Sequence, residues 1–239
     1  MRNYVSLLSR LARSNRRLGA SRVFKDAMQC ITATAFVHRR VERPRRVSIG
    51  AVLTTDDGLV VACRRRHSFF WSEIADTRSA ARRGRLAAKH AAALARAGAA
   101  RAADDVVFPG GAPLRGESAV DCALREVEEE TGIRRADVAL DTRLFVHAFI
   151  DDLVTGRDFD AVLFTGAVRL TSAEVARRFA PNSEVKGLVF LRPGEGGVVG
   201  ALAAFAREAA RARCWGALRG GRDDVDEPPL ADAHHGALA

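Results

Sequence analysis

One stretch of the chain, Gly111–Ile133 (GAPLRGESAVDCALREVEEETGI), restricts its possible folds more than any other. From Ser118 onward no glycine or proline interrupts it before Gly132, and Asp121 follows Ser118 at the spacing of a capping pair. Gly132 can adopt the left-handed conformation at which many helices end. The stretch therefore predicts a short helix that is entered from a glycine loop, Pro109–Gly111.

Three glutamates of this predicted helix project from one face. Glu126, Glu129 and Glu130 stand at positions i, i+3 and i+4, so they lie side by side. Small residues flank them and a neighbouring stripe suits a core; these are Ala119, Cys122 and Ala123, and Val120, Leu124, Val127 and Thr131. Carboxylates this close repel one another, and a hard divalent cation relieves the repulsion. The pattern therefore predicts a divalent metal site.

A solvated acidic helix face is the simpler interpretation, and it accounts for the three glutamates. It does not account for the Gly-Gly loop, Glu117, Arg125 and the terminal glycine occurring together. The stretch resembles in full the Nudix signature, G-x5-E-x7-R-E-U-x-E-E-x-G-U, in which U is aliphatic. The fixed positions are filled by Gly111, Glu117, Arg125, Glu126, Val127, Glu129, Glu130, Gly132 and Ile133. The complete match favours a catalytic helix over an acidic surface.

The composition narrows the class of partner and the number of domains. The formal net charge is +9 and the isoelectric point is near 10.5, which points to a polyanionic partner. Only Lys25, Lys89 and Lys186 are lysines, and a GC-rich genome also produces such an arginine bias, so part of this signal is not functional. A chain of 239 residues with 48% hydrophobic residues suffices for one domain with an elaboration.

The cysteines are scattered along the chain without a CxxC pair. They are Cys30, Cys63, Cys122 and Cys214. This spacing predicts free thiols in a reducing compartment, and it excludes a CxxC-type zinc site and a disulfide framework.

The first 24 residues form a basic segment without an acidic residue. Four apolar residues recur at helical spacing among six arginines: Tyr4, Leu7, Leu8 and Leu11, and Arg2, Arg10, Arg13, Arg16, Arg17 and Arg22. The segment is too short and too polar to span a bilayer, and its composition resembles a mitochondrial targeting segment. The alternative, which we favour, is an ordinary N-terminal helix packed on the domain. We assign residues 1–30 to this N-terminal segment.

Predicted strands precede a basic insertion. Residues 31–37 alternate as in a strand, and an Asp-Gly turn between Val47–Leu53 and Leu59–Cys63 predicts a hairpin. Residues 64–71 (RRRHSFFW) interleave cations with aromatic rings, which suits contact with phosphates and bases, although the aromatic residues could equally be core. Residues 77–103 predict helices of an insertion at about 72–105, with a basic face for a polyanion or, alternatively, for solvent. The basic residues are Arg78, Arg82, Arg83, Arg85, Lys89, His90, Arg96 and Arg101.

The remaining elements complete one domain over residues 31–215. We expect strands at 143–150, 159–170 and 185–191, a short helix from the Thr171/Glu174 capping box to Phe179, and a closing helix at 199–215. His147 alternates with apolar neighbours and is expected to be structural. From residue 216 the composition predicts a disordered tail to residue 239, so His234 and His235 receive no ligand role.

Short matches outside the signature resemble one family, the poxvirus mRNA-decapping Nudix hydrolases, and in particular the late-expressed, cytoplasmic one of the two. They occur in order from the N-terminus to about Trp215: Asn15–Leu18, Thr34–Val37, Arg46–Ser48, Ser68–Phe69, Ser72–Ile74, Pro109–Gly111, Asp141–Arg143 and Phe190–Leu191. The resemblance implies an α/β Nudix fold with a mixed sheet sandwiched between helices, an N-terminal segment and the helical insertion.

The resemblance also implies a reaction. The chain would cleave the 5′ m7GpppN cap of mRNA to m7GDP and RNA with a 5′-monophosphate, which promotes mRNA turnover and host shutoff. Mg²⁺ or Mn²⁺ would neutralise the charge that develops on the phosphates. The metal ligands would be Gly111 (through its carbonyl), Glu126, Glu129, Glu130 and Glu184. Glu184 could instead be the general base or a surface residue, Arg125 would orient a glutamate, and Glu117 would support the loop or an outer metal.

Methylated guanine carries a positive charge, so aromatic rings should stack on it. By resemblance the rings are those of Phe69 and Phe159, with Asp152 accepting hydrogen bonds from the base edge. The expected partner is capped mRNA in the host cytoplasm, with association of residues 1–24 with a mitochondrial membrane surface as a further expectation and no obligate protein partner. The alternatives are a Nudix hydrolase of free nucleoside diphosphate derivatives and a non-catalytic RNA-binding Nudix-fold protein.

Overall fold

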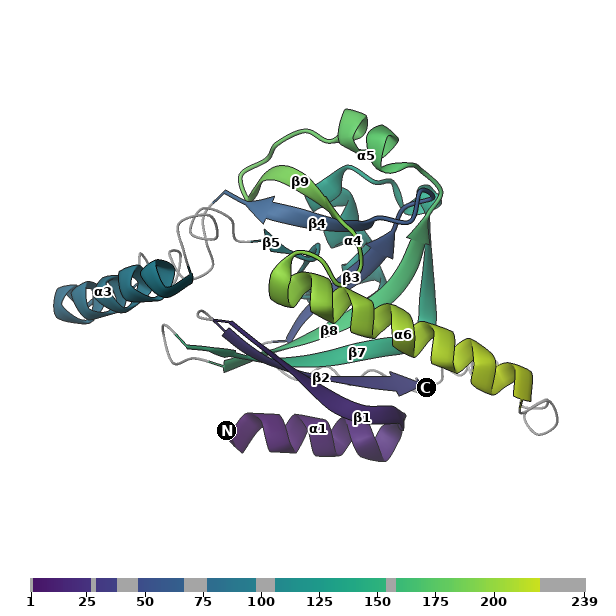
Figure 1. Cartoon of the computed structure of the whole chain (residues 1–239), viewed down its shortest axis with the longest axis horizontal. Coiled ribbons are helices and arrows are strands. Elements are labelled where there is room, and N and C mark those ends of the chain that lie inside the picture. The colour runs from purple at the N-terminus through teal and green to yellow at the C-terminus, as the bar shows by residue number, and fades with distance from the viewer. Residues whose placement is uncertain are drawn as a thin grey trace, which may run out of the picture.

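A mixed β-sheet forms the centre of the protein (Figure 1). The computed structural model describes residues 2–26, 29–37, 47–66, 77–97, 106–153 and 158–219. The strands are β1 (Arg16–Lys25), β2 (Gln29–Val37), β3 (Val47–Thr54), β4 (Val60–Arg65), β5 (Val106–Val107), β6 (Gly110–Gly111), β7 (Val138–Asp152), β8 (Asp158–Val168) and β9 (Val185–Leu191). The helices are α1 (Arg2–Ser14), α3 (Ala80–Ala97), α4 (Ala119–Thr131), α5 (Ser172–Arg178) and α6 (Gly197–Arg219), with a 3-10 turn η1 (Arg135–Asp137).

The strand order explains how a loop reaches the middle of the sheet. The order is β1-β2-β7-β8-β3-β4-β5, with β6 added to β3 and β9 added to β4. Only the β3–β8 pair is parallel among the pairings of the described strands. Strands β3 and β4 pair only next to their turn, at Leu53↔Val61 and Thr54↔Val60. Further along they diverge, and β6 pairs with β3 while β9 pairs with β4.

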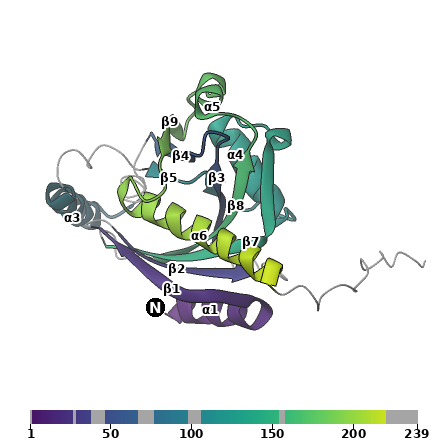
Figure 2. The ribbon, with the colours of Figure 1, turned by 45° about the vertical axis from the view of Figure 1, so that its right-hand side comes forward.

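Helices cover both faces of the sheet, as the sequence predicts. Helix α6 packs on one face, where Leu202 and Phe205 join a cluster with Val146 and Leu163. Helices α1 and α4 pack on the opposite face, where their residues meet strand residues such as Phe36 and Phe145. Figure 2 shows α6 crossing one side of the sheet and α4 lying on the other. The mixed sheet between helices is therefore confirmed.

The predicted catalytic helix forms with both of its predicted ends. Ser118 is the N-cap of α4, and its hydroxyl accepts a hydrogen bond from the Asp121 backbone N–H at 2.9 Å. Gly132 ends the helix in the left-handed conformation, with φ 72°. These caps fix where α4 begins and ends, and hence which residues face the sheet.

The N-terminal segment differs from its prediction in its second half. Residues 2–14 form the expected helix, and Leu7 and Leu11 are buried against the sheet at 4% and 0% exposure. Residues 16–25 instead form β1, an edge strand that pairs with β2. The predicted boundary after residue 30 is therefore not a break in the structure, because the sheet continues across it. In the described part, no helix combines the length and apolar character needed to span a bilayer.

Other predicted elements lie where the sequence places them. The hairpin, the α5 capping box at Thr171 and Glu174, strand β9 and helix α6 are all present. The insertion contributes α3, which stands apart from the sheet in Figures 1 and 2. Cys30, Cys63 and Cys122 are free thiols. Residues 67–76, 98–105 and the predicted tail from residue 220 lie outside the described residues, and α6 extends past residue 216 to Arg219.

Candidate active site

The glycine loop lies where β3 and β4 separate. The Pro109 carbonyl accepts a hydrogen bond from the Ala51 backbone N–H at 3.0 Å, which holds the loop against β3. A Cβ atom on Gly110 would lie 2.7 Å from the Gly50 Cα, so neither backbone leaves room for a side chain here. The two glycines therefore permit a close approach that brings the loop next to α4.

Gly111 meets the first glutamate of the helix. A Cβ on Gly111 would lie 2.6 Å from the carboxyl carbon of Glu126. Glycine at this position thus leaves space for the Glu126 carboxylate beside the loop backbone. The Cys122 thiol lies 3.9 Å from the Gly111 carbonyl oxygen, and burial is the main cause that raises its pKa to about 12, so the thiol stays neutral.

Arg125 binds three carboxylates and the loop together. Its guanidinium donates to Glu117 at 2.8 and 3.1 Å, to Glu126 at 2.8 Å and to Glu129 at 2.9 Å. It also donates to the Ala112 carbonyl at 3.2 Å. Hydrogen bonding from Arg125 is the largest cause that lowers the pKa of Glu117 to about 2. Arg125 thus lies where the sequence predicts an orienting residue, and Glu117 lies at the loop that it was predicted to support.

Two of the predicted ligands are buried acids. Glu130 is 4% exposed and accepts a hydrogen bond from the Gly110 backbone N–H at 2.9 Å. Burial is the main cause that raises its pKa to about 7, and the charges of Glu126 and Glu184 raise it further. Burial also raises the pKa of Glu126, against the opposing effect of Arg125. Both carboxylates are therefore destabilised as anions, and a cation placed between them would stabilise them.

The other two predicted ligands are more exposed. The side chain of Glu129 is 59% exposed and is held by Arg125. Glu184 is exposed on the loop before β9, and its charge acts on both buried glutamates. The Glu184 backbone N–H donates to the Asn182 side chain at 2.9 Å, and its carbonyl accepts from the Arg66 N–H at 2.7 Å. The structure therefore brings Glu184 to the same site as the α4 glutamates.

The arrangement fits a hard divalent cation that substrate helps to bind. Among the described residues, no three acidic, histidine or cysteine side chains converge closely enough to enclose an ion by themselves. Mg²⁺-type sites commonly use one or two carboxylates and complete their coordination with water and substrate phosphates. The buried pair Glu126 and Glu130, next to the Gly111 backbone, provides such a donor set.

A cavity of about 340 Å³ lies on the sheet face that α6 covers, and Gly110 of the glycine loop lines it. Phe159 and Asp152 both line it, as predicted for a base-binding pocket, and Phe69 lies outside the described residues. Arg65 and Gly110 line the same cavity. Because the Gly110 N–H binds Glu130, the cavity and the carboxylates meet at the glycine loop.

Sequence reasoning missed two contributors to this site, the Asn182 side chain and the Ala112 carbonyl. Asn182 donates from its side chain to the Glu129 carbonyl at 2.8 Å, which ties the Glu184 loop to α4. The Ala112 carbonyl accepts a hydrogen bond from Arg125. Arg65, which belongs to the basic and aromatic run 64–71 of the sequence analysis, lies at the cavity wall. An asparagine two residues before an acid is a turn signal that could have identified Asn182. His147 is structural in position, since it is buried and its Nε2 lies 2.7 Å from Asp160 Oδ1.

Comparisons with known proteins agree with this geometry. The family model "Viral D10 N-terminal" matches residues 1–43, and the model "NUDIX domain" matches residues 81–212. The mRNA-decapping protein OPG122 of Vaccinia virus (strain Copenhagen) is 36% identical over 88% of this chain and 91% of its own length. The mRNA-decapping protein D10 of Fowlpox virus (strain NVSL) is 29% identical over 71% of this chain and 81% of its own.

Solved structures are more distant. The pyrophosphohydrolase BsRppH of Bacillus subtilis aligns at 12% identity with a TM-score of 0.44, over 81% of this chain and 98% of that chain. Hydrolases that carry a Nudix domain generally need a divalent metal ion, which agrees with the buried glutamate pair.

Proposed function

Because this chain belongs to the family of poxvirus mRNA-decapping proteins with a Nudix domain, we propose that it hydrolyses the 5′ cap of mRNA. The products are m7GDP and RNA with a 5′-monophosphate, and the substrate is capped mRNA. The observation that supports this proposal is the glycine loop, where Gly110 lines the cavity and donates to the buried Glu130, and Gly111 lies against Glu126.

Each residue of the site has a separate proposed role in the reaction. Glu126, Glu130 and Glu129, with Glu184 and the Gly111 carbonyl, would hold Mg²⁺ or Mn²⁺, which would neutralise phosphate charge and activate water. Arg125 keeps the Glu126 carboxylate oriented and fixes the loop through Ala112. Glu117 anchors Arg125 from the loop side and also accepts from the Leu114 N–H at 2.8 Å. Glu184, which is exposed on the loop before β9, is the candidate to receive a proton from water.

The cavity recognises the methylated base. Phe159 offers a ring for stacking on the cationic guanine, and Phe69 is the proposed second ring. Asp152 is 2% exposed at the cavity wall and is the proposed acceptor for the base edge. The acid and the aromatic rings stabilise the positive charge of the m7G base. Unmethylated guanine carries no such charge and is stabilised less by them.

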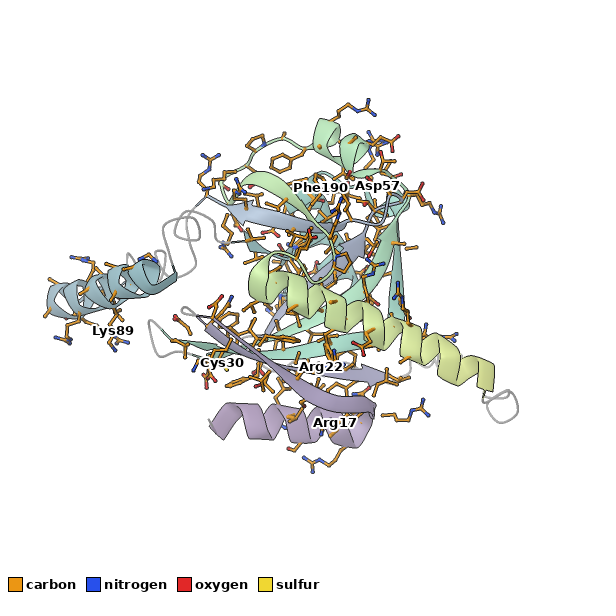
Figure 3. The ribbon with its side chains drawn as sticks, in the orientation of Figure 1. Arg17, Arg22, Cys30, Asp57, Lys89 and Phe190 are labelled. Atoms are coloured by element: carbon orange, nitrogen blue, oxygen red, sulfur yellow. The ribbon has the colours of Figure 1, made fainter. Side chains whose placement is uncertain are left out.

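The basic surface of helix α3 indicates that the substrate is RNA rather than a free nucleotide. Ala80–Ala97 contains no acidic residue, and its described basic side chains Arg82, Arg83, Arg85 and Lys89 are exposed. Figure 3 shows Lys89 on this helix, away from the sheet. A free nucleoside diphosphate derivative needs no such surface, whereas an RNA chain can lay its phosphates along it.

We expect cap-labelled RNA to be cleaved far better than the free cap dinucleotide, and we expect this advantage to shrink as salt rises. Phosphate contacts release counterions, so added salt weakens RNA binding but not the chemistry. The measurement is turnover with Mg²⁺ at several salt concentrations, with labelled products separated by chromatography. A preference for the free dinucleotide that salt leaves unchanged would instead support the alternative of a small-nucleotide hydrolase.

Two variants that lose the same number of positive charges test whether the preference for RNA depends on α3. Arg82→Gln, Arg85→Gln and Lys89→Gln combined should raise KM for capped RNA about tenfold and reduce the salt slope by about 2, since each lost single-strand contact contributes about 0.7. The control combines Arg169→Gln, Arg177→Gln and Arg192→Gln, which removes the same charge from exposed positions elsewhere. Equal losses in the two variants would show that total charge, and not α3, controls RNA binding.

We further propose that the protein acts in the host cytoplasm and associates with an anionic mitochondrial membrane surface through residues 1–24. Since Leu7 and Leu11 are buried, the association would depend on exposed arginines such as Arg10, Arg13 and Arg16. Each arginine near an anionic surface contributes about 1 kcal/mol. We expect the full chain, fused to a fluorescent protein, to colocalise with mitochondria, and the triple Arg→Gln variant at these positions to become diffuse. A wild-type fusion that is itself diffuse, while its decapping activity is intact, would refute the association.

A further inference from the structure

Arg65 lies at the end of β4, between the cavity and the buried glutamates. Its side chain is half-buried and lines the cavity together with Gly110. The pairing of β4 with β9 shifts register between Arg64 and Arg65, so that Arg65 is paired with Val185, the residue after Glu184. Such bulges often redirect a side chain next to an active site. The bulge therefore places the positive charge of Arg65 near Gly110, where the substrate phosphates would lie.

The charge of Arg65 acts on the Glu130 carboxylate, but the two side chains form no ion pair. Its charge lowers the pKa of Glu130, opposing the larger effect of burial. Within the described residues Arg65 has no ion pair, and its Nε is buried without a hydrogen-bond partner. By contrast, Arg125 on the other side of the site is fully engaged by Glu117, Glu126 and Glu129. Of these two cations at the site, only Arg65 retains donors for a ligand.

We propose that Arg65 binds the phosphates of the m7GDP half of the cap and so determines how the phosphate chain is positioned for cleavage. The inference rests on the proposed decapping function and assigns a residue that the signature helix does not contain. A base held near Phe159 and Asp152 would place its diphosphate toward Gly110, and Arg65 borders that path. A guanidinium presents several donors in a planar fork that matches phosphate oxygens, and it keeps its charge at any physiological pH.

The test separates phosphate binding from base binding by competition. With capped RNA and Mg²⁺, m7GDP and the nucleoside 7-methylguanosine are compared as inhibitors of wild type, Arg65→Ala and Arg65→Lys. We expect Arg65→Ala to weaken inhibition by m7GDP at least about tenfold and to leave inhibition by 7-methylguanosine unchanged. It should also lower kcat about 100-fold, the usual effect of losing one donor to developing charge. Arg65→Lys, which keeps the charge but not the fork, should lie between.

Arg192→Ala is the matched control. It removes one positive charge from the residue after β9, at the opposite end of the β4–β9 pair and about 20 Å from Arg65 by strand rise, and it should change neither inhibition constant. Unchanged m7GDP inhibition in Arg65→Ala, or equal weakening of both inhibitors through loss of the cavity, would overturn the inference. Failure of the decapping function itself would look different, because the wild type would then release no m7GDP from capped RNA.

Discussion

Replacing Glu130 by glutamine is expected to reduce decapping by about 1,000-fold while making the metal-free protein more stable at pH 8. Glutamine keeps the volume of the side chain and the oxygen that accepts from the Gly110 N–H. It removes the charge that holds the metal. Activity and stability should therefore change in opposite directions, as expected where a site keeps a costly charge for its function.

The stability change has a defined pH window. Burial raises the pKa of Glu130 from 4.5 to about 7, so the folded protein binds more protons than the unfolded chain between these values. Stability is therefore lost as the pH rises from about 4.5, and the loss is complete above pH 7. Glutamine avoids this loss, which is at most about 3 kcal/mol for a shift of this size. The variant should accordingly gain stability at pH 8 and gain nothing at pH 4.

Urea unfolding at both pH values, with and without Mg²⁺, measures this effect. Mg²⁺ should stabilise the wild type by binding only its folded state, and it should not stabilise the Glu130→Gln variant. Glu128→Gln is the control, since Glu128 is exposed on the same helix and occupies a variable position of the signature. Glu129→Gln should also remove activity, with little change in stability because its side chain is 59% exposed. Full activity in both Glu129→Gln and Glu130→Gln would refute the proposed metal site.

Arg125→Lys should lower kcat about 100-fold and destabilise the protein by about 2 kcal/mol, although it conserves charge. Arg125 holds Glu117, Glu126 and Glu129 at once, with a further bond to Ala112. A lysine ammonium cannot span these acceptors, because it lacks the planar fork. At least one carboxylate would lose a charge-assisted hydrogen bond, each of which contributes about 1.5–3 kcal/mol.

Melting temperature and steady-state kinetics test this prediction, with Arg134→Lys as the control at the exposed N-cap of η1. The loss should fall mainly on kcat, because Arg125 orients the Glu126 carboxylate and does not line the base cavity. An Arg125→Lys variant with wild-type kcat would show that Glu126 needs no orientation by the guanidinium fork.

The sequence alone determined the local parts of this protein. Ser118 and Gly132 fix the ends of α4, and residues at i, i+3 and i+4 share a face of any helix, so the glutamate arrangement followed without coordinates. The α5 capping box, the Asp-Gly hairpin turn and the β9 strand are likewise local signals that the structure confirms. Such features depend on hydrogen bonds and periodicities within a few residues, which neighbours in sequence can specify.

The features that depend on contacts between distant parts of the chain could be determined only from the tertiary structure. Residues 16–25 form a strand only because β2 offers them an edge, which their own basic sequence does not reveal. The burial that raises the pKa of Glu130 arises only in the folded chain, and the loop that carries Glu184 is held to α4 by Asn182. The sequence marked the whole run 64–71 for phosphate contacts, and only the fold of β4 showed that Arg65 lines the cavity with Phe159 and Asp152. These contacts join segments that are far apart in the chain. They are stabilised by the packing of the whole sheet and its helices, which no local stretch of sequence specifies.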